Sequence, residues 1–138
     1  MKTSQFQFSN PVLKKLDFQV NSNFKPEAQS EVAVSLKFNV NIHRDSQNPR
    51  AIVELTVIIG DDADSPFKIT VMESAKFRWD SELDEDHVDF LLNKNAPAVL
   101  ISYIRPTISV ITAASPFSAY NLPLIDFASE EAQDYIEE

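Results

Sequence analysis

One segment of the 138-residue chain follows a strict two-residue hydrophobic period. Over residues 31–42, Val, Leu, Phe and Ile fill every even position, whereas polar or small side chains fill the odd positions. This period predicts a strand with one buried face, because the faces of an α-helix repeat every 3.6 residues. A half-buried strand requires neighbouring strands and a second layer over its apolar side. The chain is therefore predicted to build a sheet that is covered on one face.

Two further strands are predicted downstream. Residues 51–59 are rich in Val and Ile, and residues 67–79 alternate between apolar and polar side chains. Turn-forming residues fill 43–49 and 60–66, so neighbouring strands are expected to be antiparallel. Glu73 stands on the apolar side of the third strand and predicts a bulge or bend there.

The second half of the chain changes to a helical pattern. Residues 80–89 contain six acids ahead of a short apolar run, which is typical of a helix start. Between Lys94 and Asp126 the only charged residue is Arg105. A narrow polar stripe at helical spacing crosses this apolar region and consists of Ser102, Arg105, Ser109 and Thr112. Such a helix requires more cover than a small sheet provides, so an oligomer interface is expected.

A membrane span over 97–117 is the rival interpretation of this region. The central Arg105, the prolines in the window and the lack of a basic flank argue against it. Pro106 is instead expected to kink a soluble helix. The N-terminus has polar residues where a signal peptide would need an apolar core, which predicts a cytoplasmic protein without membrane insertion.

The predicted architecture is a single α+β domain over residues 1–138. A small antiparallel sheet of about four strands carries a long kinked helix and short helices on one face. Residues 115–127 form an apolar loop punctuated by proline, and Ser129 is expected to cap a short acidic helix or tail over 128–138.

The composition excludes several kinds of chemistry. The chain has no Cys, and its only glycine, Gly60, cannot form a Gly-rich phosphate loop. The net charge of −9 argues against nucleic-acid binding. His43 and His87 lack a second His at ligand spacing, and the acidic clusters lack calcium-loop spacing. We therefore predict a protein with no enzymatic activity, no metal and no cofactor.

The aromatic inventory predicts an apolar groove instead. Amphipathic rings at the ends of elements often line such grooves, and the apolar loop offers a wall. The predicted groove residues are Phe77, Trp79, Phe90, Phe117 and Tyr120.

Family-like motifs occur in five segments, which are residues 5–8, 13–18, 67–77, 96–105 and 117–127. On these segments the chain resembles the bacterial export chaperone SecB and its uncharacterised relatives. Residues 5–8 and 13–18 look like the N-terminal strand of the family, and residues 67–77 are similar to a later strand. Residues 96–105 resemble the start of its long interface helix, with the pattern C-P-x-x-L-F-P-Y-A-R, and residues 117–127 resemble its F-P-x-L-x-L-x-P-x-x-F segment. The helix positions that fit the pattern are Pro97, Leu100, Tyr103 and Arg105.

The resemblance implies a four-stranded antiparallel sheet, dimers formed through the long helix, and tetramers formed by pairing of sheets. It also implies apolar grooves that bind unfolded polypeptide without hydrolysing anything. The predicted oligomer-interface residues are Leu100, Tyr103, Arg105, Ile108 and Ile111.

The chain departs from the family where SecB docks the export motor SecA. That surface of the family is acidic, but the matching positions here are Lys15, Gln19, Lys68 and Thr70. A basic surface should repel a partner that recognises acids, so the resemblance supports the fold better than SecA-dependent export.

The predicted function is binding of apolar segments of unfolded or nascent polypeptides by a homo-oligomer, a dimer or a tetramer. Two alternatives use the same apolar surface. One is a module dedicated to a single protein partner, and the other is a carrier of a hydrophobic small molecule or lipid.

Overall fold

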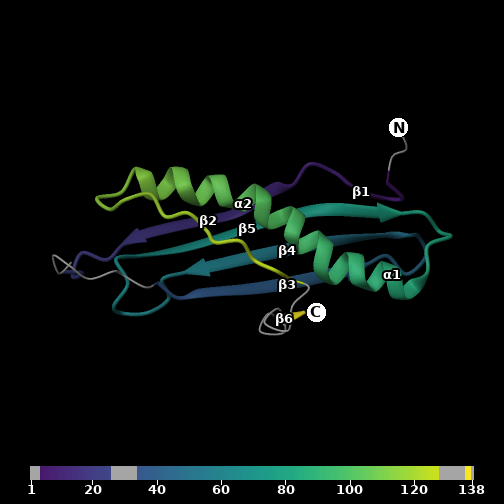
Figure 1. The fold of residues 1–138 in the computed structure, drawn as a ribbon, viewed down its shortest axis with the longest axis horizontal. Coiled ribbons are helices and arrows are strands. Elements are labelled where there is room, and N and C mark those ends of the chain that lie inside the picture. The colour runs from purple at the N-terminus through teal and green to yellow at the C-terminus, as the bar shows by residue number, and fades with distance from the viewer. Residues whose placement is uncertain (1–3, 26–33, 128–135, 138) are drawn as a thin grey trace.

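The computed structural model describes residues 4–25, 34–127 and 136–137. Figure 1 shows two layers, a sheet and a long helical segment that crosses its front face. The strands are β1 (Phe6–Phe8), β2 (Val12–Val20), β3 (Leu36–Arg44), β4 (Arg50–Ile59), β5 (Phe67–Trp79) and β6 (Ile136–Glu137). They form one sheet in the order β1-β5-β4-β3-β6, and β2 also pairs with β5. This arrangement confirms the predicted α+β class.

The three central strands pair antiparallel in unbroken registers. Alternation places the odd-numbered residues of β4 and β5 under the helices, where all of them are buried. The strand predicted over 31–42 begins at Leu36 and extends to Arg44, and residues 31–33 lie outside the described residues. The turn to β4 is closed by Asp45, whose carboxylate accepts the backbone N–H groups of Gln47 and Asn48. The hydrogen bonds that Asp45 accepts from the backbone N–H of Gln47 and from the side chain of Arg50 lower the pKa of Asp45 to about 2.

The N-terminal edge of the sheet is divided in two. β1 pairs with the end of β5 and β2 with its start, and Pro11 lies between them. β2 contains a bulge between Leu13, which pairs with Glu73, and Lys15, which pairs with Met72. The bulge predicted at Glu73 therefore lies in the neighbouring strand, and the register of β5 with β4 continues through Glu73. The extra residue shifts the alternation of β2 by one, so Leu13 before the bulge lies on the helix side together with Leu16, Phe18 and Val20 after it.

The helical layer is continuous from α1 (Glu85–Phe90) through a five-residue π-helical segment, η1 (Leu91–Asn95), to α2 (Ala96–Ala113). Its side toward the sheet is buried and includes Leu100, Ile104 and Ile108, which are four residues apart. Pro106 lies inside α2, where its missing N–H removes one helical hydrogen bond, and the helix continues past it to Ala113.

This helical run from Glu85 to Ala113 is long and apolar enough to cross a membrane by length and composition alone. The core helix of a soluble protein passes the same test. Here the run packs on β4 and β5, which accounts for its apolar inner side.

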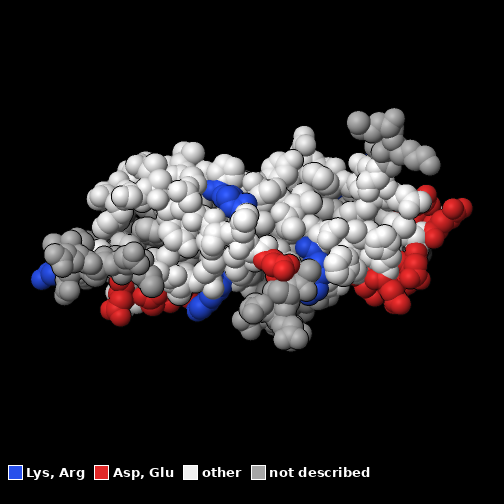
Figure 2. All heavy atoms as spheres, viewed as in Figure 1, with Lys and Arg blue, Asp and Glu red and all other residues white. Residues whose placement is uncertain are grey.

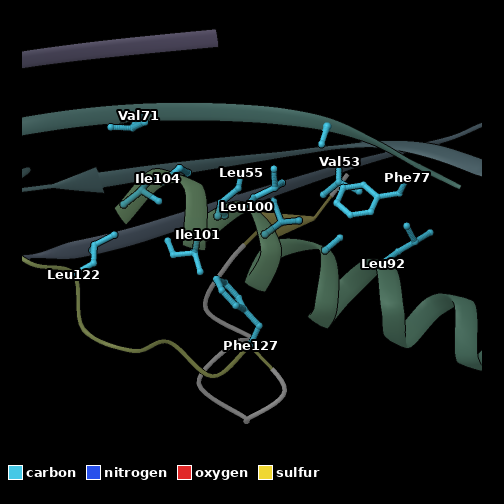
Figure 3. Close-up of a cluster of buried hydrophobic side chains, with 14 of the residues drawn as sticks. Val53, Leu55, Val71, Phe77, Leu92, Leu100, Ile101, Ile104, Leu122 and Phe127 are labelled. Atoms are coloured by element: carbon cyan, nitrogen blue, oxygen red, sulfur yellow. The ribbon is translucent and has the colours of Figure 1, made fainter. Parts of the chain in front are cut away.

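Figure 3 shows how the layers meet. Val53, Leu55 and Phe77 of the sheet face Leu92 and Leu100 of the helical layer, and all five are fully or almost fully buried. Two further buried side chains come from the segment after α2 and are Leu122 and Phe127. The core therefore joins strands, helix and the following segment.

Residues 114–127 have no regular secondary structure beyond turns, which agrees with the predicted loop. In Figure 1 this segment returns along α2 over the front of the sheet. Within the segment predicted as a short acidic helix or tail, Ile136 and Glu137 form β6, parallel to β3. Ser129 and the rest of the predicted cap lie outside the described residues.

Candidate functional site

The polar stripe of α2 anchors the returning segment. The guanidinium of Arg105 donates to the carbonyl oxygens of Leu122 and Pro123, at 3.3 and 3.0 Å. Nearer the end of the helix, the Ser109 hydroxyl lies 2.7 Å from Asn121 Oδ1, and the backbone N–H of Tyr120 donates to the Thr112 hydroxyl at 2.7 Å. Three of the four predicted stripe residues, Arg105, Ser109 and Thr112, thus position one wall of the candidate site.

An apolar cavity of about 490 Å³, here called the loop pocket, opens beside this anchored segment. Phe117 and Tyr120, two of the predicted groove residues, line this cavity, and Phe67 contributes from the start of β5. The ring of Phe67 lies 6.4 Å from that of Phe117 and 6.2 Å from that of Tyr120, measured between centroids. Burial raises the pKa of the Tyr120 hydroxyl, which keeps it neutral.

Several members of the loop pocket were not predicted from the sequence. Phe24 meets Phe117 edge-on with centroids 5.6 Å apart, although 93 positions separate them in the sequence numbering. The other missed lining residues are Val34, Pro66, Phe67, Pro116, Ser118 and Ala119. Only the apolar character of Phe24 and Phe67 was visible in the sequence, because contact between distant segments depends on the fold.

A second apolar feature, the apolar band, runs between α2 and the N-terminal edge of the sheet. Its residues are large, hydrophobic and 39–68% exposed, and they are Phe8, Leu13, Leu16, Val20, Tyr103 and Val110. The register places the strand members on the helix side of the sheet. Phe8 meets the ring of Tyr103 edge-on, with centroids 6.3 Å apart.

Figure 2 shows the charge on this side of the molecule. The surface over α2 and the returning segment is mostly uncharged, and acidic side chains gather near the ends of the molecule. At one end, Arg44 of β3 holds α1 through Glu85 at 3.0 Å and Asp89 at 3.2 Å. The guanidinium lowers the pKa of Glu85, so this clamp remains charged at neutral pH. The apolar features thus lie on a face where charge is sparse.

The predicted groove residues do not form a single groove. Phe77 is completely buried, and Trp79 is 8% exposed beneath the guanidinium of Arg44, which lies 5.3 Å from the ring centroid. Phe90 is 49% exposed on α1. Phe67 and Phe77 stand ten positions apart on β5, roughly 33 Å for an extended strand. Phe117 and Tyr120 therefore line the loop pocket at one end, whereas Phe77 and Trp79 belong to the core at the other.

The predicted interface residues also divide. Leu100 and Ile108 have no exposed surface in the single chain and pack on the sheet, so they belong to the protomer core. Tyr103 is 42% exposed, Ile111 is partly buried, and Arg105 anchors the returning segment. Tyr103 and Ile111 are the members of this set with apolar surface left for a partner.

Glu73 is a buried carboxylate on the helix side of the sheet. It is 6% exposed and stands between Leu13 of β2 and Leu55 of β4. No ion pair joins it to another residue of the part of the chain that the structure describes. Burial raises the pKa of Glu73.

Replacing Glu73 with glutamine is therefore expected to raise the melting temperature at neutral pH. Because the pKa of Glu73 is raised, the folded state binds the Glu73 proton more tightly than the unfolded state does. As pH rises from the ordinary pKa of glutamate through the raised pKa, the ionised carboxylate therefore lowers the stability of the folded state. The gain in melting temperature should shrink as pH falls below the ordinary pKa of glutamate. Thermal scans across pH measure it, with the exposed Glu82→Gln as control; a constant or absent gain would contradict this account.

The described residues contain no group of three or more His, Asp or Glu side chains that could hold a metal ion. His43 lies 3.6 Å from Glu54 on the face of the sheet opposite the helices. His87 lies in α1, within the acidic segment.

The helix side of this two-layer fold carries little charge and exposes large apolar side chains, as interaction surfaces often do. A family model described as SecB, preprotein translocase subunit SecB, matches residues 2–134. The chain therefore belongs to the SecB family, a family of chaperones, which confirms the resemblance drawn from its sequence. No curated protein matches the chain.

Solved structures from Mycobacterium tuberculosis and Streptococcus agalactiae also match the chain. The first is the Mycobacterium tuberculosis Rv1957 SecB-like chaperone in complex with a ChAD peptide from the Rv1956 HigA1 antitoxin. It has a TM-score of 0.70 and 14% sequence identity, over 88% of this chain and 91% of the other. The second is a protein of unknown function from Streptococcus agalactiae, with a TM-score of 0.47 and 14% identity, over 88% of this chain and 99% of the other.

Proposed function

We propose that this protein is a non-enzymatic chaperone that binds apolar segments of non-native or nascent polypeptides. The observation that carries the proposal is the apolar band, a row of large exposed side chains on a face with little charge. Exposed apolar surface of this kind marks interaction sites. Membership of the SecB family and the peptide complex of the Mycobacterium tuberculosis neighbour support it.

Binding would be driven by burial of apolar surface. Each Leu- or Phe-sized side chain that leaves water contributes about 1.5–3 kcal/mol before the entropic cost of ordering the peptide is subtracted. The band offers a shallow track, and the loop pocket, about 490 Å³ in volume, offers space for an aromatic side chain of the client.

We also propose that a second copy of the chain packs against the exposed apolar side chains of α2. Tyr103 and Val110 are seven residues apart on the same side of the helix, 42% and 68% exposed. A homo-oligomer would cover part of the apolar band and leave the rest for clients. We place this activity in the cytoplasm, where nascent polypeptides are available.

A module dedicated to one protein partner is the second candidate. The complex of the Mycobacterium tuberculosis SecB-like chaperone with a peptide from an antitoxin favours it, because a fold of this kind binds a segment of one named partner there. SecA-dependent export is not part of the proposal. Lys15, Gln19, Lys68 and Thr70, which align with the acidic docking surface of the family, lie on the face opposite the helices and include no acid.

The proposed function predicts that the purified protein suppresses aggregation of a chemically unfolded, slow-folding protein, followed by light scattering. Val110→Asp is expected to reduce the suppression several-fold, because a carboxylate in the apolar band resists burial. Val12→Asp is the matched control, because Val12 is 56% exposed but points to the opposite face of the sheet.

Light scattering coupled to size exclusion then separates loss of binding from loss of assembly. If the folded wild-type protein does not suppress aggregation, the proposal of a general chaperone is overturned, and the module dedicated to one partner remains as the candidate function. An equal loss in both variants would show that the apolar band is not the binding surface.

A further inference from the structure

The sheet has a second face, here called the open face, that none of the described helices or loops covers. The register assigns to it the even-numbered residues of β4 and β5 and the odd-numbered residues of β3. The helices, η1 and the returning segment all pack on the other side, where the buried side chains lie.

Cations gather at one end of the open face. Arg50 and Arg78 stand directly opposite each other on β4 and β5, which is unfavourable for like charges. Lys76 follows one step along the same face, and Lys14 lies at the bulge of β2. Within the described residues, Lys14, Lys76 and Arg78 have no acidic partner. The cluster is thus positive within a chain of net charge −9.

Lys14, Arg50 and Lys76 line a hollow with an apolar floor, and Arg78 stands opposite Arg50 at its edge. Two adjoining cavities, about 310 and 440 Å³ in volume, share His43, Ile52 and Lys76 as lining residues. Ile52 of β4 lies between His43 of β3 and Lys76 of β5, and it is 41% exposed. Of the two acids that line this hollow, Asp45 is already bonded to Arg50 at 2.9 Å, and Glu54 lies 3.6 Å from His43. We call this region the cationic hollow.

We propose that the cationic hollow docks an acidic polypeptide segment that carries an apolar side chain for Ile52. A carboxylate on the segment would bind the guanidinium of Arg78, which has no acidic partner among the described residues, in the fork geometry that arginine favours, and would offset the repulsion between Arg78 and Arg50. The net charge of −9 disfavours a long polyanion such as nucleic acid, whose phosphates extend past the patch. This surface is separate from the apolar band, so one protomer can hold both ligands at once.

The test is fluorescence anisotropy with a labelled peptide that alternates Glu and Thr around a central Leu, and with its Gln counterpart. We expect binding of the acidic peptide that weakens as salt is raised, and no comparable binding of the Gln peptide. Arg78→Glu should weaken binding about fivefold or more, because it removes one ion pair and adds a repulsive charge. Lys25→Glu, an exposed site with the same change in net charge, is the matched control.

Equal affinity for the Gln peptide, or equal loss in the Arg78 and Lys25 variants, would overturn the proposal. So would a single-stranded oligonucleotide of equal charge that binds as tightly as the acidic peptide, because the hollow would then be a general anion site. Suppression of aggregation should be unchanged in Arg78→Glu, which separates this proposal from the chaperone activity of the opposite face.

Discussion

Replacing Phe77 with alanine is expected to lower the free energy of unfolding by about 3–5 kcal/mol. Phe77 has no exposed surface, and its ring stacks on Phe6 at 5.4 Å and lies 5.9 Å from Phe8 between centroids. The truncation removes these contacts and leaves a cavity where β1 closes over the end of β5. Urea denaturation followed by circular dichroism measures the loss.

Phe90→Ala is the control, because Phe90 has the same side chain but is 49% exposed. Its loss is expected to stay below about 1 kcal/mol. If both variants lose the same free energy, or if Phe77→Ala weakens client binding at unchanged stability, Phe77 lines a groove and the core described here is wrong at that position.

Gly60→Ala is expected to cost about 2–4 kcal/mol, the second large effect. Gly60 has a φ of 78°, and a Cβ atom there would collide with the carbonyl oxygen of Phe67. The backbone at this turn cannot move aside freely, because the N–H of Gly60 donates to the carbonyl of Ser35 at 2.9 Å. The strain therefore falls on the turn that joins β4 to β5.

Chemical denaturation of Gly60→Ala beside Ala63→Ser, an exposed site in the same loop, tests this expectation. The Ala63 variant should remain within about 0.5 kcal/mol of the wild type. A Gly60 variant of unchanged stability would show that the turn accepts a side chain and that its positive φ is not required.

The strands were predictable because their signal is local. The alternation of apolar and polar residues in β3 and β5 indicates which side chains face the core, and each strand shows it independently of the rest of the chain. The bulge was placed in the wrong strand for the same reason. Glu73 breaks the pattern of β5, but the strand that changes its path is β2, where Lys14 is inserted opposite.

The candidate site was only partly predictable, because burial depends on distant partners. Phe77 and Trp79 looked like groove residues at the end of a strand, yet Phe6 and Arg44, from other strands, cover them. Phe117 and Tyr120 reach the loop pocket because the segment that carries them is anchored to α2. The polar stripe of α2 could be identified from the sequence, but the returning segment that it binds could be identified only from the structure.

The anchor of the returning segment has a consequence for how such a protein can diverge. Arg105 binds the carbonyl oxygens of Leu122 and Pro123, which every amino acid possesses, and so it does not read side chains. Leu124, the next residue, is 92% exposed. Substitutions at such exposed positions would alter the surface that meets a client while the main-chain attachment persists. Under the proposed function, client preference can therefore evolve along this segment without a new fold.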